Sequence, residues 1–227
     1  GAAIMQGDMT LGALGTVTWT DDKGQVLAFG HPFMQRGNSN FFMNRAWVLG
    51  CIPNMQSSYK VGNIGEAIGT FTQDRASGIG GKLPEQIPVH VACSDLTRGL
   101  NHSTRVQVIE DEELLPTIVD SAVINSISKT VDRNGGGTAK MHFVITGVDS
   151  KGKLLKIDRE NMYYANQGLL RNVNLEMIEA LNILMQNKLE KVNVYGITVE
   201  SEISEDAQVV EMLPLRSVRL RLVPRFL

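Results

Sequence analysis

The sequence lacks a long hydrophobic run, has little cysteine and shows no marked excess of charge of either sign. Its apolar stretches are shorter than the roughly 18 residues that a membrane-spanning helix needs, so we expect no membrane span in this chain. Only 2 Cys and 7 Pro occur among 227 residues, which excludes a disulfide-dense mini-protein and a proline-rich, low-complexity chain. The formal net charge is -2, which argues against nucleic-acid binding through a general basic field.

Motifs that would indicate a cofactor are also missing. Cys51 and Cys93 do not form a CxxC pair, and we expect them to be buried free thiols in strands, although one bridge between them also fits the sequence. No HExxH, phosphate-binding loop or GxSxG elbow occurs. None of the four histidines shows HxH or HxxxH metal spacing; they are His31, His90, His102 and His142. We therefore expect no metal and no cofactor.

What remains has an ordinary globular composition, with 43% apolar and 20% charged residues. The first half reads as short strands and tight turns, which is typical of a barrel or sandwich. Thr16–Phe29 is predicted to be a hairpin around the turn Asp21–Gly24. Further strands are predicted at Ala46–Ile52, Ala67–Gln73, Ile79–Leu83, Ile87–Ser94 and Thr104–Ile109.

The second half changes to a mixture of helices and strands. Amphipathic helices are predicted over Glu113–Val131, with Pro116 in the first turn, and over Leu175–Leu189, capped by Asn174. We thus expect residues 1–112 to form one β-unit and residues 113–227 an α+β region, which could also complete the same domain. Strands are predicted at Ala139–Thr146, Val192–Glu200, Val209–Leu213 and Val218–Val223, the last within the alternating segment Ser217–Leu227.

His31 is the histidine most suggestive of chemistry. It follows a predicted strand and stands between Gly30 and Pro32, so it would be presented at a strand end, where a general base is often found. The alternative is a turn histidine whose ring bonds to the backbone. By contrast, His90 and His142 lie within strand patterns and are predicted to sit on a solvent-facing side.

A second candidate patch is the glycine-rich stretch Gln73–Leu83. Backbone N–H groups in such a loop can form an anion or oxyanion nest, and Ser77 beside it could act as a nucleophile, with Asp74 as an acidic partner. The alternative is a plain β-turn, because Gly, Ser and Asp are also the residues that turns need. The Met- and Phe-rich stretch Phe33–Trp47 either lines a cleft or belongs to the core.

Two stretches in combination resemble the stage IV sporulation protein B (SpoIVB) serine peptidase family. Gly15–His31 (GTVTWTDDKGQVLAFGH) is similar to the hairpin that delivers that family's catalytic histidine. Ile68–Ala92, with QDR and GIGGKL, is similar to the segment that follows it. The likeness covers about Gly1–Glu110, with a weaker match at Glu160–Tyr164, and is greatest to the larger bacterial, non-sporulation members that carry FGHPF.

The resemblance implies a chymotrypsin-like double β-barrel with His31 as general base. The family's serine-containing segment does not occur after His31. Gly1–Val17 is similar to the strand that follows the family's nucleophile, so the barrel would be permuted and the nucleophile would immediately precede Gly1. The family's acidic residue cannot be placed by this match, which leaves Asp74 as a candidate by its position near the glycine loop.

Two functions follow from the resemblance, and a third, an unrelated esterase or lyase that uses His31, has only this one histidine in its favour. One is a SpoIVB-like serine peptidase acting on protein or peptide substrates. The other is a non-catalytic module of the same fold that binds peptides by strand addition or assembles at the cell surface. We expect the chain to be a piece of a larger bacterial protein, and the family implies an extracytoplasmic location in the envelope or outside the cell.

Overall fold

The computed structural model describes residues 1–76, 78–80, 86–133 and 135–207. Within them the chain is mainly β with two α-helices, which confirms the coarse fold class expected from the sequence. The helices are α1 (Leu115–Val131) and α2 (Leu175–Met185), and a 3-10 turn, η1, covers Leu169–Arg171. The strands are β1 (Ala2–Gly7), β2 (Leu11–Ala13), β3 (Val17–Thr20), β4 (Val26–Ala28), β5 (Gly37–Ile52), β6 (Tyr59–Arg75), β7 (Gly78–Gly80), β8 (Gln86–Asp95), β9 (Leu100–Ile109), β10 (Gly137–Asp149), β11 (Leu154–Ala165) and β12 (Val192–Ser204).

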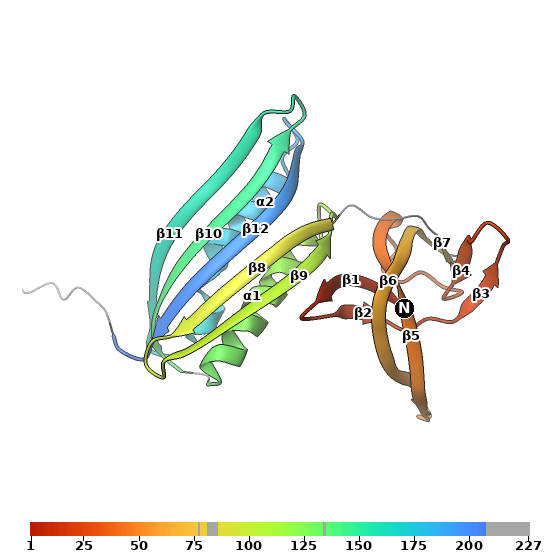
Figure 1. Cartoon of the computed structure of the whole chain (residues 1–227), viewed down its shortest axis with the longest axis horizontal. Coiled ribbons are helices and arrows are strands. Elements are labelled where there is room, and N and C mark those ends of the chain that lie inside the picture. The colour runs from red at the N-terminus through yellow and green to blue at the C-terminus, as the bar shows by residue number, and fades with distance from the viewer. Residues whose placement is uncertain (77, 81–85, 134, 208–227) are drawn as a thin grey trace, which may run out of the picture.

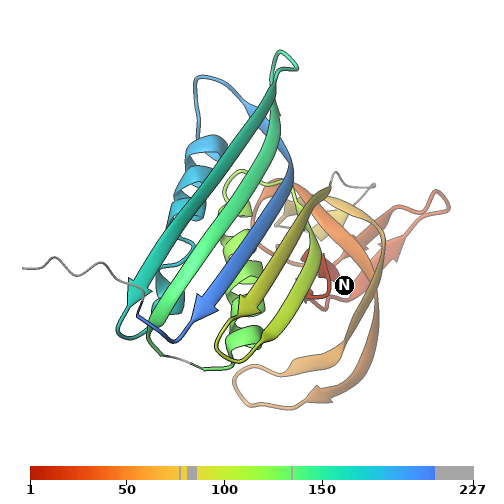
Figure 2. The same ribbon diagram turned by 60° about the vertical axis from the view of Figure 1, so that its left-hand side comes forward.

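The described strands join into one mixed sheet in the order β11-β10-β12-β8-β9-β1-β5-β6-β7-β4-β3, with β2 paired to β1. Neighbouring strands are antiparallel except β12 and β8. Helices α1 and α2 cover one face of the layer formed by β8 to β12, while β1 to β7 form a separate, strongly bent part beside it (Figures 1 and 2).

This sheet is open rather than closed into a barrel, so the chymotrypsin-like double barrel is not confirmed. A physical reason is visible in the second layer. Val91 on β8 and Val199 on β12 turn their side chains toward the helices, where both are fully buried. Because α1 and α2 cover the apolar face of these strands, that face does not need a facing sheet to exclude water.

The core follows the expected periodicities. Along β8, residues 87, 89, 91, 93 and 95 are buried, whereas His90 lies on the opposite, open face. In α1 the buried stripe includes Ile118, Val119 and Ala122, as the helical pattern predicts. The boundary expected at residue 112 stays a prediction, although β8 and β9 on its N-terminal side pair with each other and, through β8, with β12.

Several local predictions can be compared directly with the structure. The hairpin is confirmed by the pairing of β3 with β4, and Pro116 lies in the first turn of α1. Asn174 occupies the N-cap of α2 but makes no capping bond, since its side chain donates to Asp120 instead. Helix α2 ends at Met185, earlier than expected. Strand β11 was not predicted, and the segments 209–213 and 217–227 lie outside the described residues.

The cysteines and the aromatic stretch each divide into a buried and an exposed part. Both cysteines are free; Cys93 is buried as expected, but Cys51 is exposed, so the expectation of two buried thiols was wrong for it. Burial raises the pKa of the Cys93 thiol. In the aromatic stretch, Phe41 and Phe42 belong to the core, whereas Trp47 is 56% exposed.

Candidate functional site

The segment Phe29–Arg36 between β4 and β5, which we call the His31 turn, has an unusual backbone. Strand β4 ends at Ala28, and the next two residues, Phe29 and Gly30, have φ angles of 74° and 69°. A left-handed conformation is ordinary for glycine but strained for phenylalanine. The Phe29 ring packs against Phe33 and Phe71, at centroid distances of 5.7 and 6.4 Å, which holds the strained residue in place. Strain of this kind is often found at functional sites.

The His31 side chain is exposed, and its ring has a defined orientation. Nδ1 lies 2.8 Å from the Pro32 carbonyl oxygen, and the ring meets the Phe29 ring edge to face at 5.9 Å. A carbonyl oxygen only accepts hydrogen bonds, so Nδ1 carries the proton in this contact. In the neutral imidazole the lone pair then lies on Nε2, the nitrogen that a general base would use. The two sequence interpretations of His31 are therefore compatible, because its backbone bond leaves the other nitrogen available.

Asp74 holds the segment that follows His31. Its Oδ1 accepts the backbone N–H of Phe33 at 2.7 Å, and Oδ2 accepts those of Met34 and Arg36 at 2.7 and 3.2 Å. The residue is only 1% exposed. No hydrogen bond joins Asp74 to His31 in the part of the chain that the structure describes. The contacts make Asp74 a positioning residue for the turn, whereas a triad acid would bond to the imidazole.

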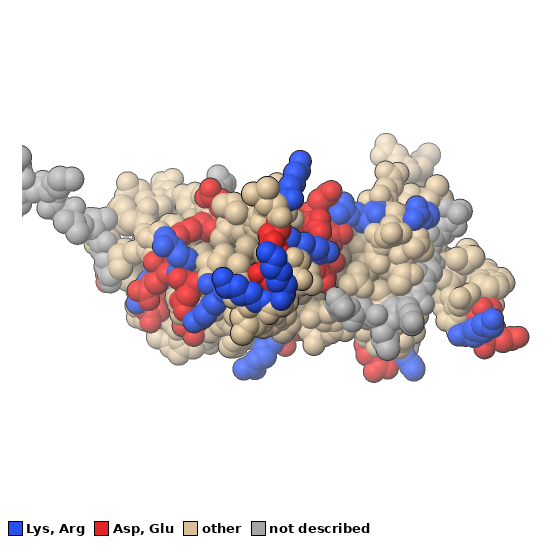
Figure 3. Space-filling model, turned by 90° about the horizontal axis from the view of Figure 1, so that it is seen from above, with Lys and Arg blue, Asp and Glu red and all other residues tan. Residues whose placement is uncertain are grey.

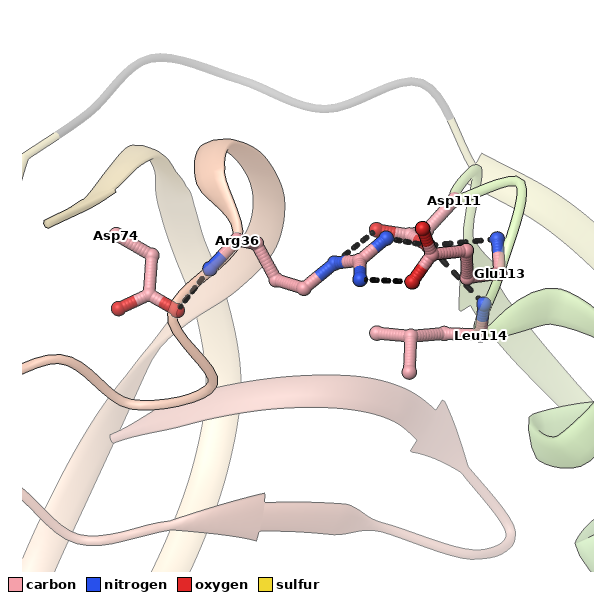
Figure 4. Close-up of polar contacts among 5 residues, drawn as sticks. All are labelled: Arg36, Asp74, Asp111, Glu113 and Leu114. Atoms are coloured by element: carbon pink, nitrogen blue, oxygen red, sulfur yellow. Dashed lines mark hydrogen bonds and ion pairs between the residues drawn. The ribbon is translucent and has the colours of Figure 1, made fainter.

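Arg36 ties the other end of this turn to the start of α1 (Figure 4). Its Nε and Nη2 donate to the two carboxylate oxygens of Asp111 at 3.1 and 2.8 Å, and Nη1 contacts Glu113 at 2.5 Å. The hydrogen bond to Glu113 and those to Asp111 raise the pKa of the guanidinium. Asp111 also accepts the backbone N–H of Leu114, so one carboxylate joins the His31 turn to the helix N-terminus.

Ser77, the predicted nucleophile of the glycine-rich stretch, lies outside the described residues. The stretch around it is placed by the register of β7, whose residue Ile79 pairs with both Asp74 on β6 and Ala28 on β4. Pro32, which follows His31, and Ala76, which precedes Ser77, line the same hollow of about 300 Å³. The structure thus places Asp74, on β6, against the turn that presents His31, and Ala76, the neighbour of Ser77 in the chain, lines the same hollow as Asp74 and Pro32.

Sequence reasoning missed several polar clusters because their partners are distant in the chain. His142 on β10 lies between Asp158 on β11 and Glu200 on β12, at 2.8 and 3.4 Å. His90 on β8 lies 2.8 Å from the hydroxyl of Ser103 on β9. Strand alternation predicts the face that these histidines occupy, but only the strand order reveals their partners.

Neither a metal cluster nor a membrane-spanning helix was found in the described ranges. No group of three or more His, Cys, Asp or Glu side chains there could hold a metal ion. No helix there is long and apolar enough to cross a membrane. On the face shown in Figure 3, basic and acidic side chains are interspersed, in keeping with the nearly balanced composition.

No family model, curated protein or solved structure matches this chain.

Proposed function

We propose that this chain is a SpoIVB-like serine peptidase domain of a larger bacterial exported protein, with His31 as the general base. The observation that carries the proposal is the presentation of His31: an exposed imidazole on a strained turn, with Nδ1–H bonded to the Pro32 carbonyl oxygen. The extracytoplasmic location is part of this proposal and comes from the family resemblance alone.

In this mechanism Nε2 of His31 accepts the hydroxyl proton of a serine as its oxygen attacks the substrate carbonyl carbon. The imidazolium then returns the proton to the leaving amine, and water releases the acyl group by the same steps. The Pro32 carbonyl takes the part that a carboxylate usually has, because it fixes the tautomer and the ring orientation. Asp74 and Arg36 act indirectly, by holding the turn against β6 and α1.

Two positions are proposed for the nucleophile. One is Ser77, the residue that follows Ala76 in the chain; Ala76 and Pro32 line one hollow. The other is the residue immediately before Gly1, as the resemblance implies. They predict different labelling patterns, so one experiment separates them.

The test is labelling with a fluorophosphonate probe, followed by mass mapping of the modified residue. It uses this chain and a version extended upstream of Gly1, each with His31→Ala, Ser77→Ala and the matched control His102→Ala. A peptidase gives an adduct that His31→Ala abolishes and His102→Ala leaves intact. The adduct maps to Ser77 or to the residue before Gly1. Labelling that persists in His31→Ala, or no adduct in either folded protein, overturns the proposal.

A second candidate function is a non-catalytic peptide-binding module of the cell surface. The observation that favours it is β11, a 12-residue strand that ends the described sheet and has a strand partner on one side only. Such an edge can accept a further strand through main-chain hydrogen bonds. A folded protein that binds peptides but takes no phosphonate label would support this alternative.

A further inference from the structure

A groove of about 770 Å³ lies away from the His31 turn, on the face of the sheet opposite the helices. One wall is the β6 segment 64–67, and the other is the open face of β9, β8, β12 and β10. This volume lies within the range of about 300–1,000 Å³ that is usual for ligand sites. The lining combines apolar side chains such as Ile64, Pro88 and Val144 with polar groups such as His90 and Gln107.

The β6 wall has a strand edge without a strand partner. On one side β6 pairs with β5 along most of its length, from Tyr59 to Asp74. On the other side it pairs with β7 only from Gln73 to Arg75. Along residues 59–71 this second edge meets no other strand of the described chain, and four consecutive residues of it, 64–67, line the groove. Such an edge can bond to the main chain of an extended peptide.

The opposite wall carries an arginine whose charge is not compensated. Asp8 fixes the Arg105 backbone, because the Arg105 N–H donates to the Asp8 carboxylate at 2.7 Å and the Asp8 N–H donates to the Arg105 carbonyl at 3.0 Å. The guanidinium itself has no ion pair or hydrogen bond with any described residue. Glu66, on the β6 wall, is ion-paired with Arg45 at 3.2 Å. Of the two charged groove residues, Arg105 is the one left to bind a ligand of opposite charge.

We infer that this groove binds an extended peptide as an added strand on β6, with the peptide's terminal carboxylate bound by Arg105. The planar guanidinium can donate two parallel hydrogen bonds to a carboxylate. His90, the direct cross-strand neighbour of Arg105, supplies a further polar group at the same wall. This site does not depend on whether His31 is catalytic.

The test compares four probes by isothermal titration calorimetry. They are the peptide acetyl-Val-Thr-Val-Thr-Val-Ala as free acid, the same peptide as C-terminal amide, the free acid N-methylated at alternate residues, and acetate alone. Each is titrated into the wild-type chain, into Arg105→Gln and into the matched control Arg75→Gln. Arg75 is exposed and lies outside the groove, where its side chain donates to Gln73 and Asn38.

For the wild type we expect the free acid to bind about five- to tenfold more tightly than the amide, as a solvent-accessible charged pair allows. Arg105→Gln reduces this ratio to about one, and Arg75→Gln leaves it unchanged. N-methylation of the free acid weakens its binding by at least the same factor as the change from acid to amide, since it removes main-chain donors. Acetate competes poorly with the peptide.

Three results would overturn the inference. Equal affinity for acid and amide would exclude the carboxylate contact, and an acid preference that survives Arg105→Gln would move it to another site, such as the edge of β11. Acetate that competes as well as the peptide would make this a site for small carboxylates. None of these outcomes changes with phosphonate labelling at His31, so this inference and the proposed function can fail separately.

Discussion

The guanidinium of Arg36 contacts both carboxylate oxygens of Asp111, 75 residues away in the chain. The two side chains are 22% and 12% exposed. This paired contact joins the turn after His31 to the N-terminus of α1, and therefore joins the bent N-terminal strands to the layer that the helices cover (Figure 4).

We predict that Arg36→Lys lowers the free energy of unfolding by about 1–3 kcal/mol, because an ammonium group cannot form both bonds to Asp111. The matched control is Glu113→Gln. Glu113 contacts the same guanidinium, but its side chain is 73% exposed, so its loss should cost less than about 1 kcal/mol. Urea unfolding of the two variants measures both values. Equal losses in the two variants would show that the contact with Asp111 stabilises the fold no more than the contact with Glu113 does.

Asp74→Asn is predicted to lower the free energy of unfolding by more than so small a change in the side chain suggests. The carboxylate accepts three backbone N–H groups while buried, and an asparagine amide would turn a donor toward one of these donors. We expect the free energy of unfolding to fall by about 2–4 kcal/mol. Asp21→Asn is the control, since the Asp21 carboxylate accepts two amides in an exposed turn and its loss should cost under about 1 kcal/mol.

This pair of variants also separates two roles of Asp74. A triad acid would lose activity on mutation while the fold kept its stability. A positioning residue loses stability and disturbs the ring signals of His31 in NMR spectra. A stable Asp74→Asn protein with unchanged His31 signals would contradict the role that the contacts indicate.

The local features of the fold were the most predictable from sequence. The β3–β4 hairpin and the buried stripe of α1 follow from turn chemistry and from hydrophobic periodicity. Strand β11 was missed because its central residues 158–162 are all exposed, which interrupts the alternation of half-buried and exposed residues seen at its two ends. The double barrel was expected from family resemblance, and no local pattern specifies how a sheet closes.

The candidate site was only partly predictable for a related reason. His31 was singled out because Gly30 and Pro32 mark the end of a strand. The roles of Asp74 and Arg36 depend on partners about 40 and 75 residues away, which no spacing rule gives. Nothing in the sequence indicated the groove between Arg105 and the β6 edge, since such a groove can be recognised only once the strand order is known.

Gly30→Ala tests whether the backbone of the turn matters for His31. A Cβ at Gly30 would meet no atom within 4 Å, so its cost comes from the φ of 69° alone. We expect the free energy of unfolding to fall by about 1–2 kcal/mol. Gly24→Ala is the matched control, because Gly24 has a φ of 76° and equally open surroundings.

Both glycine variants should lose similar stability in urea unfolding. Only Gly30→Ala should shift the His31 ring signals and slow phosphonate labelling if the domain is catalytic. Identical His31 spectra in the two variants would show that the strained turn does not determine the orientation of the imidazole.

The pH dependence of stability should contain a contribution from His142. Hydrogen bonds that the His142 ring donates to Asp158 and then to Glu200 raise its pKa above the ordinary 6.5, and Lys156 and Lys140 are cations nearby on the same face. A raised pKa in the folded state means that protonated His142 stabilises the fold below the unfolded-state pKa. This stabilisation disappears as the pH rises through the folded-state pKa.

We therefore predict that His142→Gln costs more stability at about pH 6 than at about pH 8.5. Urea unfolding of wild type and variant at the two pH values measures the difference, and NMR titration of the His142 ring locates its pKa. Asp158→Asn removes the hydrogen bond that raises the His142 pKa most, so it should lower this pKa. In that background, His142→Gln should cost nearly the same stability at both pH values. A cost that is the same at both pH values would mean that the two carboxylates do not hold the proton on His142 in solution.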